Sequence, residues 1–429
     1  GGYGSSNINL TTTPDLSLAR LDEVLDLLNA NLDGRHLFGG STTDKAPVRD
    51  VQSILNGALG RDGFRTIVGE RKLADAGNNG LGRLAVTSAA DTVTLAEDGT
   101  HPFGFKLSTL STSSSGVTLT QPAGTPPSLS VQFTALPVAG EKVAIGLTLP
   151  DGTQEVVELV AATGASSAGF FQIGADQNTT AANFATALNA SLQKLGGTTL
   201  AAASTYAAAD NFFNTHGDPV LRVDGPPFDT ATALAAATPA ETVMWYQGET
   251  QGIRGDNKGR LSLSTAGDTT AVAEFAPLAS GYGFRMTSVS EGLSNATAVL
   301  AGTSPESLAV QFTGVPNAGE NFSLRLTLPD GTTKDVALRA VTGTAGPGEF
   351  TIGADANATS ANFGAALAGG LDLAAQEAAG DPRGTVTAKV EDNTIVKYGV
   401  QANENGLVSL IRSLAAMAVE TYPTADPTT

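Results

Sequence analysis

Apolar residues recur at helical spacing near both ends of the chain. The first such segment, which we expect to form a helix over residues 16–32, has leucines at alternating steps of three and four, and a segment opening at Asn405-Gly406 repeats these steps. Narrow apolar seams of this kind are typical of coiled coils. The two seams comprise Leu18, Leu21, Leu25, Leu28, Leu407, Leu410, Leu414 and Met417. We predict that the seams pack on each other, or on copies of themselves, as a coiled-coil-like stem; an ordinary globular helix pair is the alternative.

Between the two helices the chain contains one unit twice. Residues 128–192 recur as residues 307–371 at a constant offset. In each copy, apolar and polar residues alternate on both sides of a Pro-Asp-Gly turn, which begins at Pro150 and again at Pro329. This period of two predicts a hairpin with one buried face. An Ala-rich segment that should form a short helix follows, so each copy is predicted to be a module of antiparallel strands covered by one helix.

These patterns together predict an α+β fold. A discontinuous α-helical coiled-coil-like stem would form from both chain ends, and two duplicated β-rich α+β modules would be inserted into it. We expect residues 1–50 and 383–429 to form the stem, residues 51–240 the first module and residues 259–382 the second. Residues 241–258 should return to the stem as a strand between the modules.

The composition narrows the partners that such a protein can have. A formal net charge of −18 argues against binding to nucleic acid or to anionic membrane surfaces. No apolar run approaches the roughly 18 residues that a membrane-spanning helix needs. The chain has no cysteine, which removes thiol catalysis, thiolate metal ligands and disulfides together.

No pattern of residues in the sequence indicates catalysis. Pairs of carboxylates arise by chance in so acidic a chain, and a Pro-Asp-Gly turn accounts for both Asp151 and Asp330, with calcium binding there as a minor alternative. Trp245-Tyr246 indicates a packed core strand, with a sugar-stacking platform as the alternative. We therefore expect no enzyme activity, no catalytic residue, no metal ligand and no cofactor.

Three segments outside the repeats resemble the bacterial flagellin family. The first runs from Leu25 through Leu37-Phe38-Gly39-Gly40 to Val48, and it is similar to the stretch that closes the N-terminal helical region in hook–filament junction proteins and alphaproteobacterial flagellins. The second is Trp245-Tyr246-Gln247-Gly248-Glu249. The third, KYGVQANENG at residues 397–406, resembles the junction that leads into the C-terminal helix of the family.

This resemblance implies a structural protein of the flagellum. It implies an extracellular subunit at the hook–filament junction, exported through the flagellar channel, whose partners are copies of itself and neighbouring junction or filament subunits. The outermost terminal helices of the family are not part of this sequence, so we expect this central fragment to be monomeric. A filament flagellin proper is one alternative, and a cell-surface adhesin whose modules bind glycans is a second.

Overall fold

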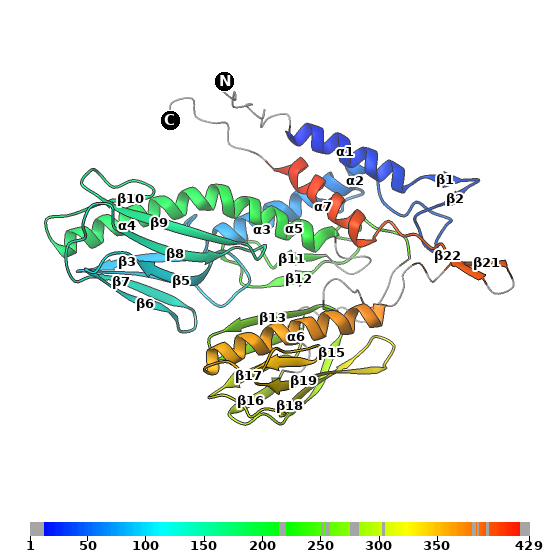
Figure 1. The fold of residues 1–429 in the computed structure, drawn as a ribbon. Helices are drawn as coiled ribbons and strands as arrows, with labels where there is room; N and C mark the ends of the chain where they lie inside the picture. The colour runs from blue at the N-terminus through cyan, green and yellow to red at the C-terminus, as the bar shows by residue number, and fades with distance from the viewer. Residues whose placement is uncertain are drawn as a thin grey trace, which may run out of the picture.

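The structure combines a helical core with two similar β-rich units (Figure 1). It is a computed structural model that describes residues 13–213, 220–249, 253, 258–274, 283–302, 305–379, 383, 386–391 and 394–420. We refer to residues 84–195 as repeat 1 and to residues 261–379 as repeat 2. In Figure 1, repeat 1 lies to the left and repeat 2 at the bottom.

The helical core is built from segments far apart in the sequence. Its helices are α1 (Thr13–Leu28), α2 (Val51–Asn56), α3 (Phe64–Ala76), α5 (Ala201–Phe213) and α7 (Asn405–Val419). Helix α7 packs against both α1 and α5, and α3 packs against α5. The centre of the core is aromatic, because Phe213 lies edge-on to both Phe64 and Trp245 with ring centroids 5.2 and 5.8 Å apart.

The expected α+β fold with a discontinuous coiled-coil-like stem is wrong. The structure has a mixed α/β architecture with many antiparallel sheets, and its described helices include no coiled-coil stem. Helices α1 and α7 do pack on each other, but each has only about four turns and shares its core with α3 and α5. The apolar seams are therefore part of a globular helix cluster and do not form an extended two-stranded rod.

Helix α1 is also shorter than the predicted 16–32. It ends at Leu28, and β1 (Asn31–Leu32) and β2 (Arg35–His36) form a small hairpin immediately after it. Asp33 and Gly34 adopt positive φ angles of 50° and 80° at the turn, a conformation that a helix cannot contain. Leu32 is consequently 66% exposed.

Repeat 1 consists of two four-stranded sheets covered by one long helix. The strands are β3 (Leu84–Ala89), β4 (Thr92–Glu97), β5 (Lys106–Thr112), β6 (Val117–Ala123), β7 (Ser128–Phe133), β8 (Lys142–Thr148), β9 (Gln154–Ala162) and β10 (Phe170–Gln172), and the helix is α4 (Gln177–Leu195). One sheet has the order β3-β4-β7-β6 and the other β10-β9-β8-β5. All neighbouring strands are antiparallel except β9 and β10.

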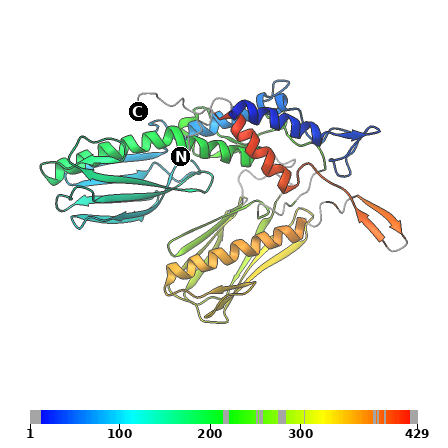
Figure 2. The same ribbon diagram turned by 45° about the horizontal axis from the view of Figure 1, so that its top comes forward.

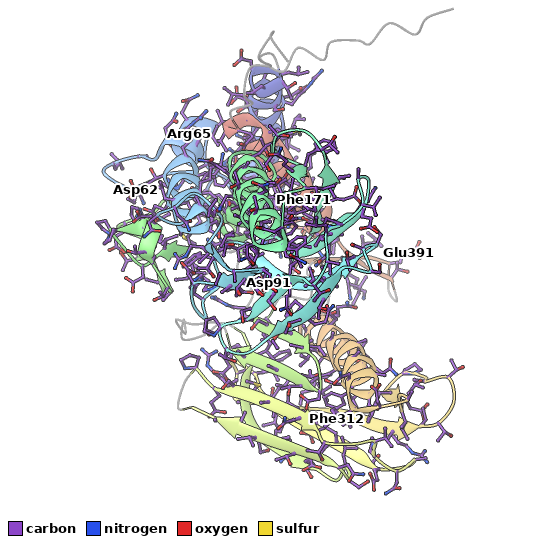
Figure 3. All side chains as sticks on the ribbon, turned by 90° about the vertical axis from the view of Figure 1, so that its left-hand side faces the viewer. Asp62, Arg65, Asp91, Phe171, Phe312 and Glu391 are labelled. Carbon is purple, nitrogen blue, oxygen red and sulfur yellow. The ribbon has the colours of Figure 1, made fainter. Side chains whose placement is uncertain are left out.

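Repeat 2 has the same topology. Its strands are β13 (Leu261–Ala266), β14 (Thr269–Glu274), β15 (Arg285–Glu291), β16 (Ala296–Ala301), β17 (Ser307–Phe312), β18 (Asn321–Thr327), β19 (Thr333–Val341) and β20 (Glu349–Thr351), and its helix is α6 (Ala356–Ala379). The sheet orders are β13-β14-β17-β16 and β15-β18-β19-β20. Phe171 of repeat 1 and Phe312 of repeat 2, both labelled in Figure 3, are almost completely buried in their units.

Equivalent side chains shape the turns of the two repeats. The carboxylate of Asp151 accepts hydrogen bonds from the amide and hydroxyl of Thr153 at 3.0 and 2.6 Å, and Asp330 does the same for Thr332 at 2.9 and 2.6 Å. The Pro-Asp-Gly hairpins predicted from the sequence are therefore confirmed, and their aspartates serve the turn. Asp176 then caps α4 by accepting a 2.7 Å hydrogen bond from the amide of Thr179.

Repeat 1 is joined to the helical core by a continuous helical connection and by a buried arginine. Helix α4 continues through a π-helical turn (Gly196–Leu200) into α5 of the core, as Figure 2 shows in green. Arg83, at the start of repeat 1, is 5% exposed and donates to Asp98 at 2.7 Å and to the carbonyl of Ala231 at 2.9 Å. These contacts hold repeat 1 against α3 and its neighbours.

Two further short ladders complete the described structure. Strands β11 (Leu221–Val223) and β12 (Leu234–Ala236) form a ribbon beside α3, with a 3-10 turn (Phe228–Thr230) between them. Strands β21 (Thr387–Glu391) and β22 (Thr394–Lys397) form an antiparallel hairpin that precedes α7.

The loop around Glu320 in repeat 2 predicts a specific response to acid. Its carboxylate accepts hydrogen bonds from the side chain and amide of Asn317 and from Ser294, at distances from 2.7 to 2.9 Å. These bonds, with that of the Asn317 side chain the strongest, lower the pKa of Glu320 from 4.5 to about 2. The stabilisation is therefore complete above the ordinary pKa and is lost as the pH falls from about 4.5 to about 2.

We predict that Glu320→Gln lowers the melting temperature at pH 6 and reduces its dependence on pH below 4.5. Melting followed by circular dichroism from pH 6 to pH 2 measures both effects. Glu155→Gln is the matched control, because that carboxylate accepts a longer bond, of 3.3 Å, from the adjacent amide of Val156. Identical melting curves for Glu320→Gln and the unsubstituted protein at every pH would contradict the assignment.

Candidate assembly surface

The three segments that resemble flagellins meet in the structure. Gly39 pairs with Gln401, and the amide of Ala402 donates to the carbonyl of Phe38 at 2.8 Å. Val48 pairs in the same way with Tyr246. Segments from both ends of the chain and from between the repeats therefore form one junction beside α1 and α7.

Further hydrogen bonds join the middle segment, residues 245–249, to the first segment, residues 25–48. The amide of Arg49 donates a hydrogen bond to the carbonyl of Trp245 at 3.0 Å, and the amide of Gln247 donates one to the carbonyl of Pro47 at 2.7 Å. The carboxylate of Glu249 accepts from the amide of Ser41 at 2.8 Å. Because these bonds are mostly between backbone groups, they position the segment whatever its side chains are.

Gly40 is required where the segments cross. Its φ of +65° favours glycine, and a Cβ atom there would lie 2.5 Å from the Glu249 carboxylate and 3.1 Å from the Gln401 amide nitrogen. A side chain at this position would therefore strain the backbone and displace the ends of the Glu249 and Gln401 side chains. The glycine pair noted in the sequence thus has a steric role at the junction.

Trp245 and Tyr246 form the apolar centre of the junction. Trp245 is fully buried and Tyr246 is 2% exposed, so a sugar ring cannot stack on either face, and the packed-core interpretation is confirmed. Burial raises the pKa of the Tyr246 hydroxyl, and the nearby Glu249 carboxylate raises it further. The tyrosine is therefore uncharged at any physiological pH.

The predicted seam of α1 faces the core. Leu21, Leu25 and Leu28 are at most 3% exposed, and Leu18 is half-buried against the same cluster. The leucine spacing of three and four correctly gives the buried face of this helix.

The predicted seam of α7 does not coincide with the buried face of this helix. Its buried residues are Val408, Ile411, Ala415 and Ala418, each one position beyond the seam drawn from the sequence. Leu410 is 44% exposed, while Leu407, Leu414 and Met417 are partly buried. A shift of one residue rotates the face of a helix by about 100°. We refer to these four residues as the outer stripe of α7: Leu410 is exposed, whereas Leu407 and Leu414 are partly buried against the core cluster.

Two neighbouring faces of α7 are apolar in the sequence. The prediction chose the face with the larger side chains, the leucines and the methionine, and this choice was wrong. The face that meets α1 and α5 carries β-branched and small residues, because Ala415 and Ala418 allow the helices to approach closely. Leu410 is left exposed, and Leu407 and Leu414 lie at the edge of the buried face. The signal for the true core face was the presence of small residues, Ala415 and Ala418, at a spacing of three.

Charged contacts anchor the C-terminal end of α7. The carboxylate of Glu420 accepts from Lys72 of α3 at 2.9 Å and from the hydroxyl of Thr205 of α5 at 2.5 Å. Arg412 forms an ion pair with Asp210 of α5 and lies 5.0 Å from the centre of the Tyr206 ring. These contacts fix the direction in which the outer stripe of α7 points.

The described residues contain no arrangement that suggests catalysis or metal binding. They include no cluster of three or more His, Asp or Glu side chains able to hold a metal ion. Among the same residues, no helix is long and apolar enough to cross a membrane. Leu410 of α7, at 44% exposed, and Leu16 and Leu27 of α1, at 62% and 63%, are apolar side chains of this region that reach the surface.

Comparisons with known proteins identify no family for this chain. No protein-family model and no curated protein matches the sequence. The resemblance to flagellins therefore depends on the three short segments, and membership of that family stays a prediction.

The two faces of α7 can be distinguished by truncation. We predict that Ile411→Ala lowers the free energy of unfolding by about 2–5 kcal/mol, because Ile411 is fully buried and its loss leaves a cavity. Leu410→Ala, the adjacent control, should change it by less than about 1 kcal/mol. Urea unfolding of both variants is the measurement. A larger loss for Leu410→Ala would place the predicted leucine seam in the core after all.

Proposed function

We propose that this protein is a structural subunit of the bacterial flagellum, located at the hook–filament junction. It would associate with copies of itself and with neighbouring junction or filament subunits through the α1–α7 side of its helical core. The proposal makes the protein extracellular and gives it a mechanical role without a cofactor.

The observation that carries the proposal is the meeting of the three flagellin-like segments. Residues 25–48, 245–249 and 397–406 resemble flagellins in sequence and lie far apart along the chain. Their pairing through Gly39–Gln401 and Val48–Tyr246 is what a core shared by both chain ends requires. It favours a common structural origin over three chance similarities.

The outer stripe of α7 supports a role in association. The stripe lies about 100° around α7 from its buried face, and its Leu410 is 44% exposed. Contact with a neighbouring subunit would remove these side chains from water. In Figures 1 and 2, both repeats lie apart from α1 and leave the α1–α7 pair at a border of the molecule.

The repeats have the properties of outward-facing modules. Each has its own apolar core, so each can vary at its surface without disturbing the helical core. Their sheets contain many exposed threonine and serine residues, as in β5 and β15. Such modules would cover the outside of a polymer, in the junction protein or in a filament flagellin alike.

Seeded assembly tests the proposal. The protein as its cell makes it is incubated with isolated hooks of the same bacterium and examined by electron microscopy. We expect a short collar confined to the hook tips. Long filaments would instead make the protein a filament flagellin, and soluble monomers under all conditions would contradict both assignments and favour a surface adhesin.

A substitution in the outer stripe tests the surface itself. We predict that Leu410→Asp abolishes assembly on hooks with little change in melting temperature, because a charge there opposes burial in a neighbour. Val156→Asp on β9 is the control, since Val156 is 56% exposed and lies in repeat 1. Equal assembly by both variants would show that the stripe of α7 is not a contact.

A further inference from the structure

His101 is a buried histidine at the place where repeat 1 meets the helical core. Its side chain is 1% exposed, and it lies in the loop of residues 98–105 between β4 and β5. The Nε2 atom lies 2.6 Å from a carboxylate oxygen of Asp98, and the Nδ1 atom lies 3.3 Å from the amide nitrogen of Phe103. Because an amide can only donate, Nδ1 accepts this bond, and the neutral ring carries its proton on Nε2 and donates it to Asp98.

The loop that contains His101 docks repeat 1 on the helical core. Phe103 is fully buried, and it packs in a small apolar cluster with Ala74 of α3 and with Val223 and Ala231 of the β11–β12 segment. The guanidinium of Arg71, also on α3, lies 5.3 Å from the centre of the Phe103 ring. The position of Phe103 therefore decides whether this contact between repeat 1 and α3 is made.

Polar contacts fix the loop on either side of Phe103. The carboxylate of Asp75 accepts a 2.8 Å hydrogen bond from the amide of Gly104, and Arg71 donates to the carbonyl of Pro102 at 3.1 Å. Asp75 is fully buried and pairs with Arg71 at 2.7 Å, so α3 brings one anion and one cation that balance each other. The loop is thus held at residues 102–104, and His101 holds the middle one through its amide.

Two cations lie near His101 in addition to Asp98. Asp98 is shared, because its second carboxylate oxygen accepts from Arg83 at 2.7 Å, and Lys106 is paired with Glu97 at 3.1 Å. Burial lowers the pKa of His101 most strongly, the hydrogen bond to Asp98 raises it, and the charges of Lys106 and Arg83 lower it further. The pKa therefore lies below the ordinary 6.5 of histidine, and the ring is neutral at pH 7.

We propose that His101 is a pH-sensitive latch that holds repeat 1 on the helical core and releases it in acid. Protonation adds a hydrogen to Nδ1, which can then no longer accept from the amide of Phe103. It also adds a positive charge beside Arg83 and Lys106, while Asp98 remains shared with Arg83. The loop of residues 98–105 then leaves α3, and repeat 1 stays connected to the core through the continuous helix of α4 and α5.

The direction of the pH effect follows from the pKa of His101 in the two forms. In the released loop the ring is in water and its pKa is about 6.5, whereas in the docked loop its pKa is lower. The docked form is therefore fully favoured above pH 6.5, and it becomes less stable relative to the released form as the pH falls below that value. The acid response of Glu320 occurs in a different range, below pH 4.5.

The sequence of repeat 2 lacks the residues of the latch. Its segment between β14 and β15, residues 275–284, reads FAPLASGYGF and contains neither histidine nor aspartate, whereas repeat 1 has DGTHPFGF at residues 98–105. Both segments end in Gly-Phe, so they occupy equivalent places in the two repeats. The histidine and the aspartate belong to the repeat whose loop docks on α3, which supports a role at that contact.

Hydrogen–deuterium exchange with mass spectrometry tests the latch on the full chain from pH 7.5 to pH 5, with rates corrected for the intrinsic effect of pH. We expect the protection of residues 102–105 to fall about tenfold over this range, while peptides from β8 stay protected. In His101→Gln the protection should not change with pH, because glutamine offers an acceptor to Phe103 and a donor to Asp98 without titrating. His36→Gln is the matched control and should respond like the unsubstituted protein.

The pH at which protection is lost provides a second test. We expect Lys106→Gln to move the loss to higher pH, because removal of that cation raises the pKa of His101. A shift to lower pH would contradict the latch. So would undiminished protection of the unsubstituted protein down to pH 5, an equal loss in His101→Gln, or a loss that includes β8, since the last would mean unfolding of the whole repeat.

These outcomes are separate from those of the proposed function. A histidine-dependent release in a protein that never assembles on hooks would establish the latch and remove the flagellar assignment. A collar on hooks, with exchange at residues 102–105 that does not depend on His101, would remove the latch alone.

Discussion

The pairing of Gly39 with Gln401 and of Val48 with Tyr246 is the constraint on which the rest of the structure depends. It closes the chain, since it brings both terminal segments and the segment between the repeats to one place. Gly40 adopts a φ of 65° where these segments cross, which favours glycine there, and the ring of Trp245 is fully buried at the junction. Helices α1 and α7 lie side by side because the segments that follow and precede them are tied here.

Because these pairings join the segments that flank the repeats, the helical core forms even though two large repeats lie between its parts in the sequence. The repeats have equivalent turns and sheet orders, and equivalent phenylalanines pack edge-on at nearly the same distances, 5.2 Å for Phe171–Phe184 and 5.3 Å for Phe350–Phe363. Repeat 1 is additionally held by Arg83 and by the helix that continues from α4 into α5. A protein built in this way can change the surface of its repeats while its helical core remains unchanged.

Local structure was predictable from the sequence where one physical rule acts alone. The Pro-Asp-Gly hairpins and the leucine face of α1 follow from turn chemistry and periodicity. The Ala-rich helix of each repeat was also expected, although at 19 and 24 residues it is longer than predicted. Prediction failed where tertiary packing chose between two allowed patterns. On α7 both faces are apolar, and the closeness of α1 selected Ile411 and the alanines over Leu410. At Asp33-Gly34 a positive-φ turn ended α1 one turn early, and the extended stem that its longer seam suggested is absent from the described structure.

The location of the protein on the cell tests the central claim, that it is a subunit of the flagellum, more directly than any property of the purified chain. Antibodies raised against the exposed surface of repeat 2 should decorate native flagella in immunogold electron microscopy. The account predicts gold particles at the boundary between hook and filament. Labelling of the cell envelope, with none on hooks or filaments, would contradict it.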